Sequence, residues 1–283
     1  SQQFNSIVMA LAGAERIFEL MDEEPEVDNG YVTLVNAKYD KNGELVETPE
    51  KTNIWAWKHP HEDGTTTYTQ VRGDVRFFDV DFGYNPDKII VHDFSADVHD
   101  GQKVAIVGPT GAGKTTMVKL LMRFYETSEG DIRYGKTNVG EISTTALRSS
   151  ISYVTQETFL FEDTIENNIK VAKEDASREE VVAAAKKAAL HEFILSLPDG
   201  YDTKLAELGD SVSGGERQRI AIARSLASNP KLVVLDEPTS SIDVFSQAQI
   251  LELLRELKEK FQLTNILISH DLGVVSQMAN KIA

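Results

Sequence analysis

The opening stretch of the chain carries a helical pattern and then loses it. Over residues 1–24, apolar side chains recur every three or four positions, which predicts an amphipathic helix. An acidic stretch around Pro25 ends this pattern. Residues 29–70 are polar and rich in turn residues, and alternation over 31–35 indicates a short hairpin. We interpret residues 1–28 as a linker helix and residues 29–70 as a polar insert or linker without a core of its own.

From Val71 onward, strand patterns alternate with helical ones. Strands are expected over 75–80, 89–91, 103–107, 151–154, 232–235 and 266–268. Helices are expected over 115–124, 164–197, 217–227 and 250–261. The apolar run at 232–235 is typical of a parallel sheet that is buried on both faces. The expected fold class is α/β, with a mainly parallel core sheet, an antiparallel β-subdomain over about 71–100 and a helical subdomain over about 157–215.

Composition and charge exclude several classes of protein. The 283 residues are 41% hydrophobic and 26% charged, which is typical of a globular chain. No apolar run approaches the roughly 20 residues that a membrane-spanning helix needs, so none is expected here. The net charge is −16, and residues 1–70 contribute half of it, so a nucleic-acid partner is not expected. The absence of cysteine excludes disulfides and cysteine-ligated zinc.

One stretch fits a complete phosphate-binding motif, G-x-x-x-x-G-K-[ST], between a predicted strand and a predicted helix. Its residues are Gly108, Pro109, Thr110, Gly111, Ala112, Gly113, Lys114 and Thr115. The glycines let backbone N–H groups turn inward around phosphate oxygens, and the helix N-terminus adds partial positive charge. Lys114 is expected to reach the β- and γ-phosphates, and the Thr115 hydroxyl to hold Mg²⁺. The motif predicts a core of the phosphate-loop NTPase type that binds ATP and Mg²⁺.

Two further segments complete the predicted chemistry. Asp236 and Glu237 follow a buried strand, where Asp236 can enter the Mg²⁺ shell and Glu237 can polarise an attacking water. Ser213 fits a helix N-cap, and Glu216 three residues later completes a capping box. The two glycines between them expose N–H groups at a helix N-terminus and so form a second phosphate cradle. One chain with two cradles indicates that one of them serves the nucleotide of a neighbour.

In this order, the motifs resemble those of the nucleotide-binding domain of ATP-binding cassette (ABC) transporters over about residues 71–283. The resemblance implies that Tyr84 stacks on adenine and that the phosphate loop extends to Thr116. The implied catalytic residues are Lys114, Gln156, Glu237 and His270, and the implied metal ligands are Thr115, Gln156 and Asp236. The implied contacts to the ATP of a partner domain come from Ser213, Gly214, Gly215, Glu216 and, in the loop Ser241–Asp243, Asp243.

Other stretches resemble particular branches of that family. Residues 14–22 resemble the place where the last transmembrane helix of an exporter enters the ATPase domain, and 82–87 are exporter-like as well. The stretches 236–240, 246–250 and 269–275 look more like importer ATPases. The loop Leu208–Ser211 is shorter than the corresponding exporter loop. These features indicate a mosaic, natural or engineered, that has been excised at the membrane exit of a multidrug or lipid exporter.

The resemblance implies an ATPase that converts ATP to ADP and phosphate and powers export. Its implied partners are a second nucleotide-binding domain, in a head-to-tail sandwich around two ATP molecules, and a transmembrane domain. The expected location is the cytoplasmic face of the membrane, or the cytoplasm for the isolated chain.

Three alternatives remain open for the function. They are a nucleotide-binding module with little or no hydrolysis, an importer-type ATPase, and a soluble cassette ATPase that acts on DNA or ribosomes. The presence of Glu237 argues against the first, and the exporter-like residues 1–28 argue against the second. The net charge and the membrane-exit segment argue against the third.

Overall fold

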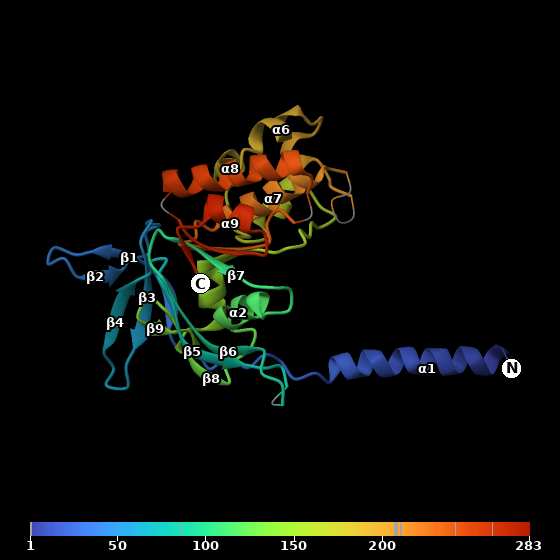
Figure 1. The fold of residues 1–283 in the computed structure, drawn as a ribbon, viewed down its shortest axis with the longest axis horizontal. Helices are drawn as coiled ribbons and strands as arrows, with labels where there is room; N and C mark the ends of the chain where they lie inside the picture. The colour runs from blue at the N-terminus through green and yellow to red at the C-terminus, as the bar shows by residue number, and fades with distance from the viewer. Residues whose placement is uncertain (1, 86, 207–208, 210, 241, 262) are drawn as a thin grey trace.

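The structure is a computed structural model that describes residues 2–85, 87–206, 209, 211–240, 242–261 and 263–283. These residues form a layered body from which one N-terminal helix projects (Figure 1). Four positions named above lie outside the described residues: Leu208, Asp210 and Ser241, together with Pro86 in the exporter-like stretch.

A five-stranded parallel sheet forms the centre of the body, in the order β10-β11-β12-β7-β13. Its strands are β7 (Lys103–Val107), β10 (Ile151–Val154), β11 (Leu232–Asp236), β12 (Thr264–Ser269) and β13 (Lys281–Ile282). Successive side chains point to opposite faces of a strand, so Leu232 and Val234 join one core cluster while Val233 and Leu235 join the other. The sheet is therefore covered on both faces, as the apolar run of β11 predicts.

Helices cover the two faces of this sheet. They are α2 (Lys114–Leu121), α7 (Gly214–Ala227), α8 (Val244–Phe261) and α9 (Leu272–Met278). Figure 1 shows α7, α8 and α9 on one side of β7, and α2 on the other. Because all strand pairs are parallel, the carboxyl ends of the strands meet at one edge of the sheet. The segments that follow β7, β10, β11 and β12 therefore gather at that edge.

A second sheet is antiparallel, in the order β6-β5-β8-β9. Its strands are β5 (Val75–Phe82), β6 (Val91–Val98), β8 (Glu129–Tyr134) and β9 (Thr137–Asn138). The predicted antiparallel region ends near residue 100, but the chain returns to this sheet after α2, where β8 pairs with β5 and β9 pairs with β8. The strand expected over 89–91 begins at Val91 and runs to Val98, because its backbone pairs with β5 along that length.

Residues 29–70 contain more structure than the expected hairpin. They form a four-stranded antiparallel sheet, in the order β2-β1-β3-β4. The strands are β1 (Thr33–Tyr39), β2 (Leu45–Glu47), β3 (Trp55–Pro60) and β4 (Thr66–Gln70). Trp57 is buried and meets the Tyr134 ring edge-on, with centroids 5.5 Å apart. This N-terminal sheet, formed by β1 to β4, thus packs onto the sheet formed by β5, β6, β8 and β9 and shares its core cluster.

The region expected to be helical over 164–197 contains three short helices. They are α4 (Ile165–Lys170), α5 (Arg178–Lys187) and α6 (His191–Ser196), and α3 (Thr144–Ser150) lies before them. Ser177 and Glu180 form a capping box that starts α5. Helices α4 and α5 pack against α7. The domain boundaries themselves, including a helical subdomain over about 157–215, stay a prediction.

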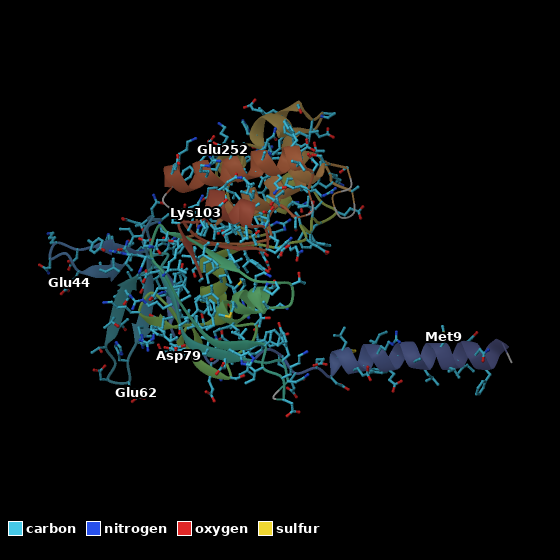
Figure 2. All side chains as sticks on the ribbon, in the orientation of Figure 1. Met9, Glu44, Glu62, Asp79, Lys103 and Glu252 are labelled. Atoms are coloured by element: carbon cyan, nitrogen blue, oxygen red, sulfur yellow. The ribbon has the colours of Figure 1, made fainter. Side chains whose placement is uncertain are left out.

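The N-terminal helix α1 (Gln2–Met21) stands apart from the body. Figure 2 shows Met9 on it, far from the other labelled side chains. Its apolar side chains are exposed, among them Phe4, Ile7, Met9, Leu11, Ile17, Phe18 and Leu20. Within the described residues, neither α1 nor any other helix is sufficiently long and apolar to cross a membrane.

Candidate nucleotide-binding site

The phosphate loop connects β7 to α2 and needs its glycines. Gly111 and Gly113 have φ angles of 84° and 82°, which other residues rarely adopt. A Cβ atom at Gly113 would also lie 2.9 Å from Cγ2 of Val91. The Ala112 N–H donates to the Pro109 carbonyl at 3.1 Å and closes the turn. The loop therefore reaches the N-terminus of α2 in a conformation that this glycine spacing permits.

Lys114 folds over the phosphate loop. Its Nζ donates to the carbonyl oxygens of Gly108 and Pro109, at 2.8 and 3.0 Å, and the side chain is nearly buried. Among the described residues, no carboxylate forms an ion pair with it. A cation without an acidic partner, beside a helix N-terminus, suits an anionic ligand such as a phosphate group.

A hydroxyl and a carboxylate meet beside this loop. Thr115 Oγ1 donates to Asp236 Oδ2 at 2.9 Å, and the Tyr153 hydroxyl donates to the same oxygen at 3.0 Å. Asp236 is only 2% exposed. Hydroxyl and carboxylate oxygens are ligands that Mg²⁺ prefers, so Thr115 and Asp236 fit the metal site that was predicted for them.

Tyr153 is a residue that the sequence motifs missed. It lies on β10, beside Val234 of β11, and so reaches the end of the neighbouring strand. Burial raises the pKa of its hydroxyl, and the nearby Asp236 carboxylate raises it further. The hydroxyl therefore stays protonated and donates to the carboxylate. Its only sequence signal was its place three residues before Gln156, on a strand expected to lie in the parallel sheet.

Two predicted residues, Gln156 and His270, converge on a third, Glu237. The Gln156 Nε2 donates to Glu237 Oε2 at 3.2 Å, and His270 Nδ1 lies 2.9 Å from Glu237 Oε1. Glu237 follows β11, while Gln156 and His270 follow β10 and β12, so the three come from adjacent strand ends. The Glu237 carboxylate can accept a proton here, and the amide of Gln156 and the imidazole of His270 can form hydrogen bonds to a small polar ligand at the edge of the sheet.

The backbone of Glu237 is unusual for a residue with a side chain. Its φ is 45°, in the left-handed region, and its N–H donates to the Ile268 carbonyl at 2.9 Å. Such a conformation costs on the order of 1 kcal/mol or more and tends to occur at active sites. The hydrogen bond to β12 holds this conformation and directs the carboxylate toward His270.

Tyr84 lies against the phosphate-loop helix. Its hydroxyl is 3.1 Å from Thr116 Oγ1. The ring meets Phe82 and Tyr125 edge-on, with centroids 5.1 and 5.0 Å away, and remains 43% exposed. An aromatic ring that is held by neighbouring rings and is partly exposed is able to stack on a flat ligand.

The signature segment, Ser213–Gln218, forms the start of α7. The Ser213 N–H donates to the Glu216 carboxylate at 2.7 Å, and Ser213 Oγ accepts from the Glu216 N–H at 3.3 Å. This is the predicted capping box, and it occupies the Glu216 carboxylate. A Cβ at Gly215 would lie 2.9 Å from Ser246 Oγ. Among the described residues, no hydrogen bond joins this segment to the phosphate loop.

Asp243 occupies the equivalent capping position before α8. Its Oδ1 accepts from the backbone N–H groups of Phe245 and Ser246, at 3.1 and 3.0 Å. Hydrogen bonds from Ser246 hold the pKa of this exposed carboxyl below its usual value. Asp243 is therefore ionised at neutral pH and accessible beside the signature segment.

A small cavity lies between the segment after Gln156 and the signature segment. Its volume is about 190 Å³, and Gln156, Thr158, Gly214 and Gln218 line it. Thr158 Oγ1 donates to Gln218 Oε1 at 2.5 Å, whereas Gln218 Nε2 is buried without a hydrogen-bond partner among the described residues. The segment that carries Gln156 is thus in direct contact with the signature segment.

Comparisons with known proteins show the family of this chain. The ABC transporter family model matches residues 91–240. An uncharacterised ABC transporter ATP-binding protein of Bacillus subtilis, YfiC, is 38% identical over 282 residues, which is 100% of this chain and 41% of YfiC. The ATP-dependent lipid A-core flippase of Desulfotalea psychrophila is 36% identical over 275 residues, which is 97% of this chain and 42% of the flippase.

A solved structure of an ABC exporter is also similar to this chain. The structure of a bacterial Atm1-family ABC exporter with ATP bound matches at a TM-score of 0.70 and 36% identity, covering 96% of this chain and 42% of that one. The chain thus spans about two fifths of the length of these relatives. The expected α/β fold and an ATP-binding domain of the ABC type are confirmed. The chain belongs to the ABC transporter family, as an ATP-binding domain with exporters among its relatives.

Proposed function

We propose that this chain hydrolyses ATP at the phosphate loop with Glu237 as the general base. The observation that carries the proposal is the convergence of Gln156, Glu237 and His270 at neighbouring strand ends, next to the Thr115–Asp236 pair. Lys114 and the loop N–H groups bind the β- and γ-phosphate oxygens. Glu237 takes a proton from water while the water oxygen bonds to the γ-phosphorus and the bond to the β–γ bridging oxygen breaks. The products are ADP and phosphate.

The other predicted residues support this reaction. Thr115, Asp236 and Gln156 would hold Mg²⁺, which neutralises charge on the phosphate oxygens when it is bound. His270 donates to a γ-phosphate oxygen, and the partly exposed ring of Tyr84 stacks on the adenine. The direct test is steady-state release of phosphate from ATP by the purified chain. ATP binding without phosphate release would favour a nucleotide module that does not hydrolyse.

Replacing Tyr153 by Phe is expected to raise the Mg²⁺ concentration that half-maximal hydrolysis requires by about tenfold. The hydroxyl orients Asp236 Oδ2, and losing a group that orients a metal ligand typically costs 10–100-fold in metal affinity. Titrating Mg²⁺ at saturating ATP measures the change. Tyr68→Phe is the matched control, because the hydrogen bond that the structure describes for the Tyr68 hydroxyl goes to Glu47 on the N-terminal sheet. Equal Mg²⁺ requirements in the two variants would contradict the assignment.

A complete site is proposed to need two chains. Ser213, Gly214, Gly215, Glu216 and Asp243 are proposed to contact the ATP held by the phosphate loop of a partner domain. Glu216 does so indirectly, because its carboxylate caps α7 and keeps the N–H groups of the two glycines facing outward. Bound ATP then joins two domains head to tail.

We expect the chain to be monomeric without nucleotide and to dimerise with MgATP, most completely as the Glu237→Gln variant. Two chains of charge −16 repel each other, and salt screens exposed charges over about 8 Å at 0.15 M. Moderate salt should therefore favour the dimer. Light scattering with MgATP at low and moderate salt measures the mass. A dimer that forms without nucleotide, or a variant that stays monomeric at high concentration with MgATP, would argue against the sandwich.

We also propose that the domain works at the cytoplasmic face of a membrane and powers export. The apolar side chains of α1 are exposed, as expected of a helix that continues from a membrane domain. Phe159 and Phe161 follow Gln156, are exposed, and meet edge-on at 5.0 Å. This aromatic pair suits contact with the transmembrane partner, so Gln156 lies between that contact and the nucleotide.

A further inference from the structure

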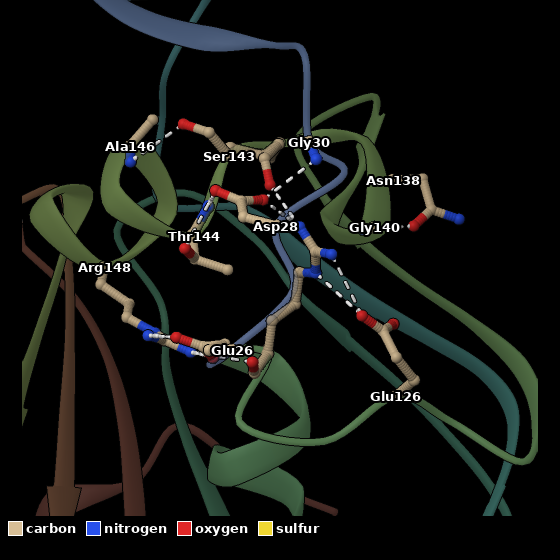
Figure 3. A network of polar contacts seen from close by, with 12 residues as sticks. Glu26, Asp28, Gly30, Glu126, Asn138, Gly140, Ser143, Thr144, Ala146 and Arg148 are labelled. Atoms are coloured by element: carbon tan, nitrogen blue, oxygen red, sulfur yellow. Dashed lines mark hydrogen bonds and ion pairs between the residues drawn. The ribbon is translucent and has the colours of Figure 1, made fainter. Parts of the chain in front are cut away.

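We propose that two arginines whose side chains meet at the C-terminal end of α2 are positioning residues: Arg123, just beyond α2, and Arg148, which lies on α3. They tie the connecting segment, residues 22–32, to the phosphate-loop helix, so that the position of this segment sets the affinity for ATP. The inference rests on the proposed function and adds residues that no motif contains. Figure 3 shows the network of polar contacts around these residues.

Arg123 lies just beyond the C-terminal end of α2. Its φ is 53°, at a position where helices commonly place glycine, and its side chain is only 5% exposed. The left-handed conformation is unfavourable for a residue that has a side chain. The contacts of the buried guanidinium must therefore offset both this conformational cost and the loss of hydration.

Those contacts fix Arg123 from three sides. Its Nη1 donates to the Ile142 carbonyl at 2.6 Å and lies 3.5 Å from Asp28 Oδ1. Its Nε and Nη2 both donate to Glu126 Oε1 at 3.1 Å. Asp28 belongs to the connecting segment, so a buried charge at the end of α2 is neutralised in part by a residue outside the predicted ATPase domain.

Asp28 is itself held firmly. Its Oδ2 accepts from the Thr144 backbone N–H and hydroxyl, at 2.8 and 3.0 Å, and its Oδ1 accepts from the Gly30 N–H at 3.0 Å. Burial alone would raise the pKa of Asp28, but these hydrogen bonds outweigh it and hold the pKa below its usual value. A Cβ at Gly30 would lie 2.4 Å from the Ile142 carbonyl carbon, so the backbone of the segment runs directly against the domain.

Arg148 makes the second connection. Its guanidinium pairs with both carboxylate oxygens of Glu26. The same group donates through Nε to the Met122 carbonyl at 3.0 Å and through Nη2 to the Arg123 carbonyl at 2.8 Å. These carbonyls lie at the C-terminal end of the phosphate-loop helix, where cations are favoured. One side chain therefore links the connecting segment to α2.

The two ends of α2 thus have different partners. The N-terminal end carries Lys114 and Thr115, and the C-terminal end is joined through Arg123 and Arg148 to the segment that follows α1. An eight-residue helix is short and stiff, so a shift at one end moves the other. A displacement of α1 would therefore alter how the phosphate loop holds ATP.

The experiment is a double-mutant cycle on the more exposed ion pair of this network, Glu26 and Arg148. We expect Glu26→Gln and Arg148→Lys each to weaken binding of a fluorescent ATP analogue about three- to tenfold, because Lys cannot pair bidentately with a carboxylate. The double variant should bind the analogue about as tightly as the single variant with the lower affinity, because both substitutions break the same contact. The Michaelis constant for ATP should rise by the same factor, with an unchanged turnover number. Glu24→Gln is the matched control, because it removes the same charge from an exposed position that shows no polar contact among the described residues.

The outcomes separate this inference from the proposed function. Wild-type chain that neither binds nor hydrolyses ATP would overturn the proposed function. Wild-type activity, with both variants equal to Glu24→Gln, would overturn the positioning role alone. Affinity is measured well below the midpoint of thermal unfolding, so a purely structural role would lower that midpoint and leave affinity unchanged. That result, or additive effects in the double variant, would also overturn the inference.

Discussion

Replacing Glu237 by Gln is expected to slow phosphate release by about 10²–10⁴-fold and to leave ATP affinity unchanged. The amide keeps the shape of the side chain, and it can still contact Gln156 and His270, which lie 3.2 and 2.9 Å from the carboxylate oxygens. It cannot accept the proton of the attacking water, so only the chemical step is lost. The left-handed backbone at this position is common to both side chains and does not change with the substitution.

Phosphate release in a single turnover, with ATP bound beforehand, measures this effect directly. Glu162→Gln is the control, because Glu162 is exposed and its removal changes the charge by the same amount. A Glu237→Gln variant that retains more than about a third of the wild-type rate would remove Glu237 from the role of base.

Replacing Lys114 by Ala is expected to weaken binding of ATP by roughly 10- to 150-fold, because a charge-assisted hydrogen bond contributes about 1.5–3 kcal/mol. Within the described part of the chain, the Lys114 amine donates to two carbonyls of its own loop, and it lies at the N-terminus of α2. The affinity of a fluorescent ATP analogue is the measurement. Lys136→Ala removes an exposed lysine elsewhere and should bind as wild type does. Unchanged affinity in Lys114→Ala would rule out the phosphate-binding assignment.

Local motifs explain why much of the site could be predicted from the sequence. The phosphate loop and the capping box at Ser213 depend on neighbouring residues, so their spacing is visible in the chain. The apolar run of β11 likewise reveals a strand that is buried on both faces. Local spacing alone does not show that Gln156, Glu237 and His270 meet, because their meeting depends on which strands are neighbours in the sheet.

Features that depend on distant partners were missed. Tyr153 matters because β10 lies beside β11, and no local pattern marks it. Of the N-terminal sheet, the sequence predicts only a short hairpin, because β2 and β4 are short and their polar positions make the alternation weak. Arg123 falls inside the helix predicted over 115–124, where nothing in the local pattern sets it apart, and its partner Asp28 lies 95 positions away.

The buried Trp57 has a consequence for how this chain can be divided. Every motif of the nucleotide site lies after residue 71, which suggests a natural place to cut. Yet the Trp57 ring rests on Tyr134, and Val32 joins the same core cluster. A fragment that began at β5 would keep all of its chemistry and expose part of its interior to water. For anyone who moves this domain into another protein, the graft that folds is longer than the stretch that binds ATP.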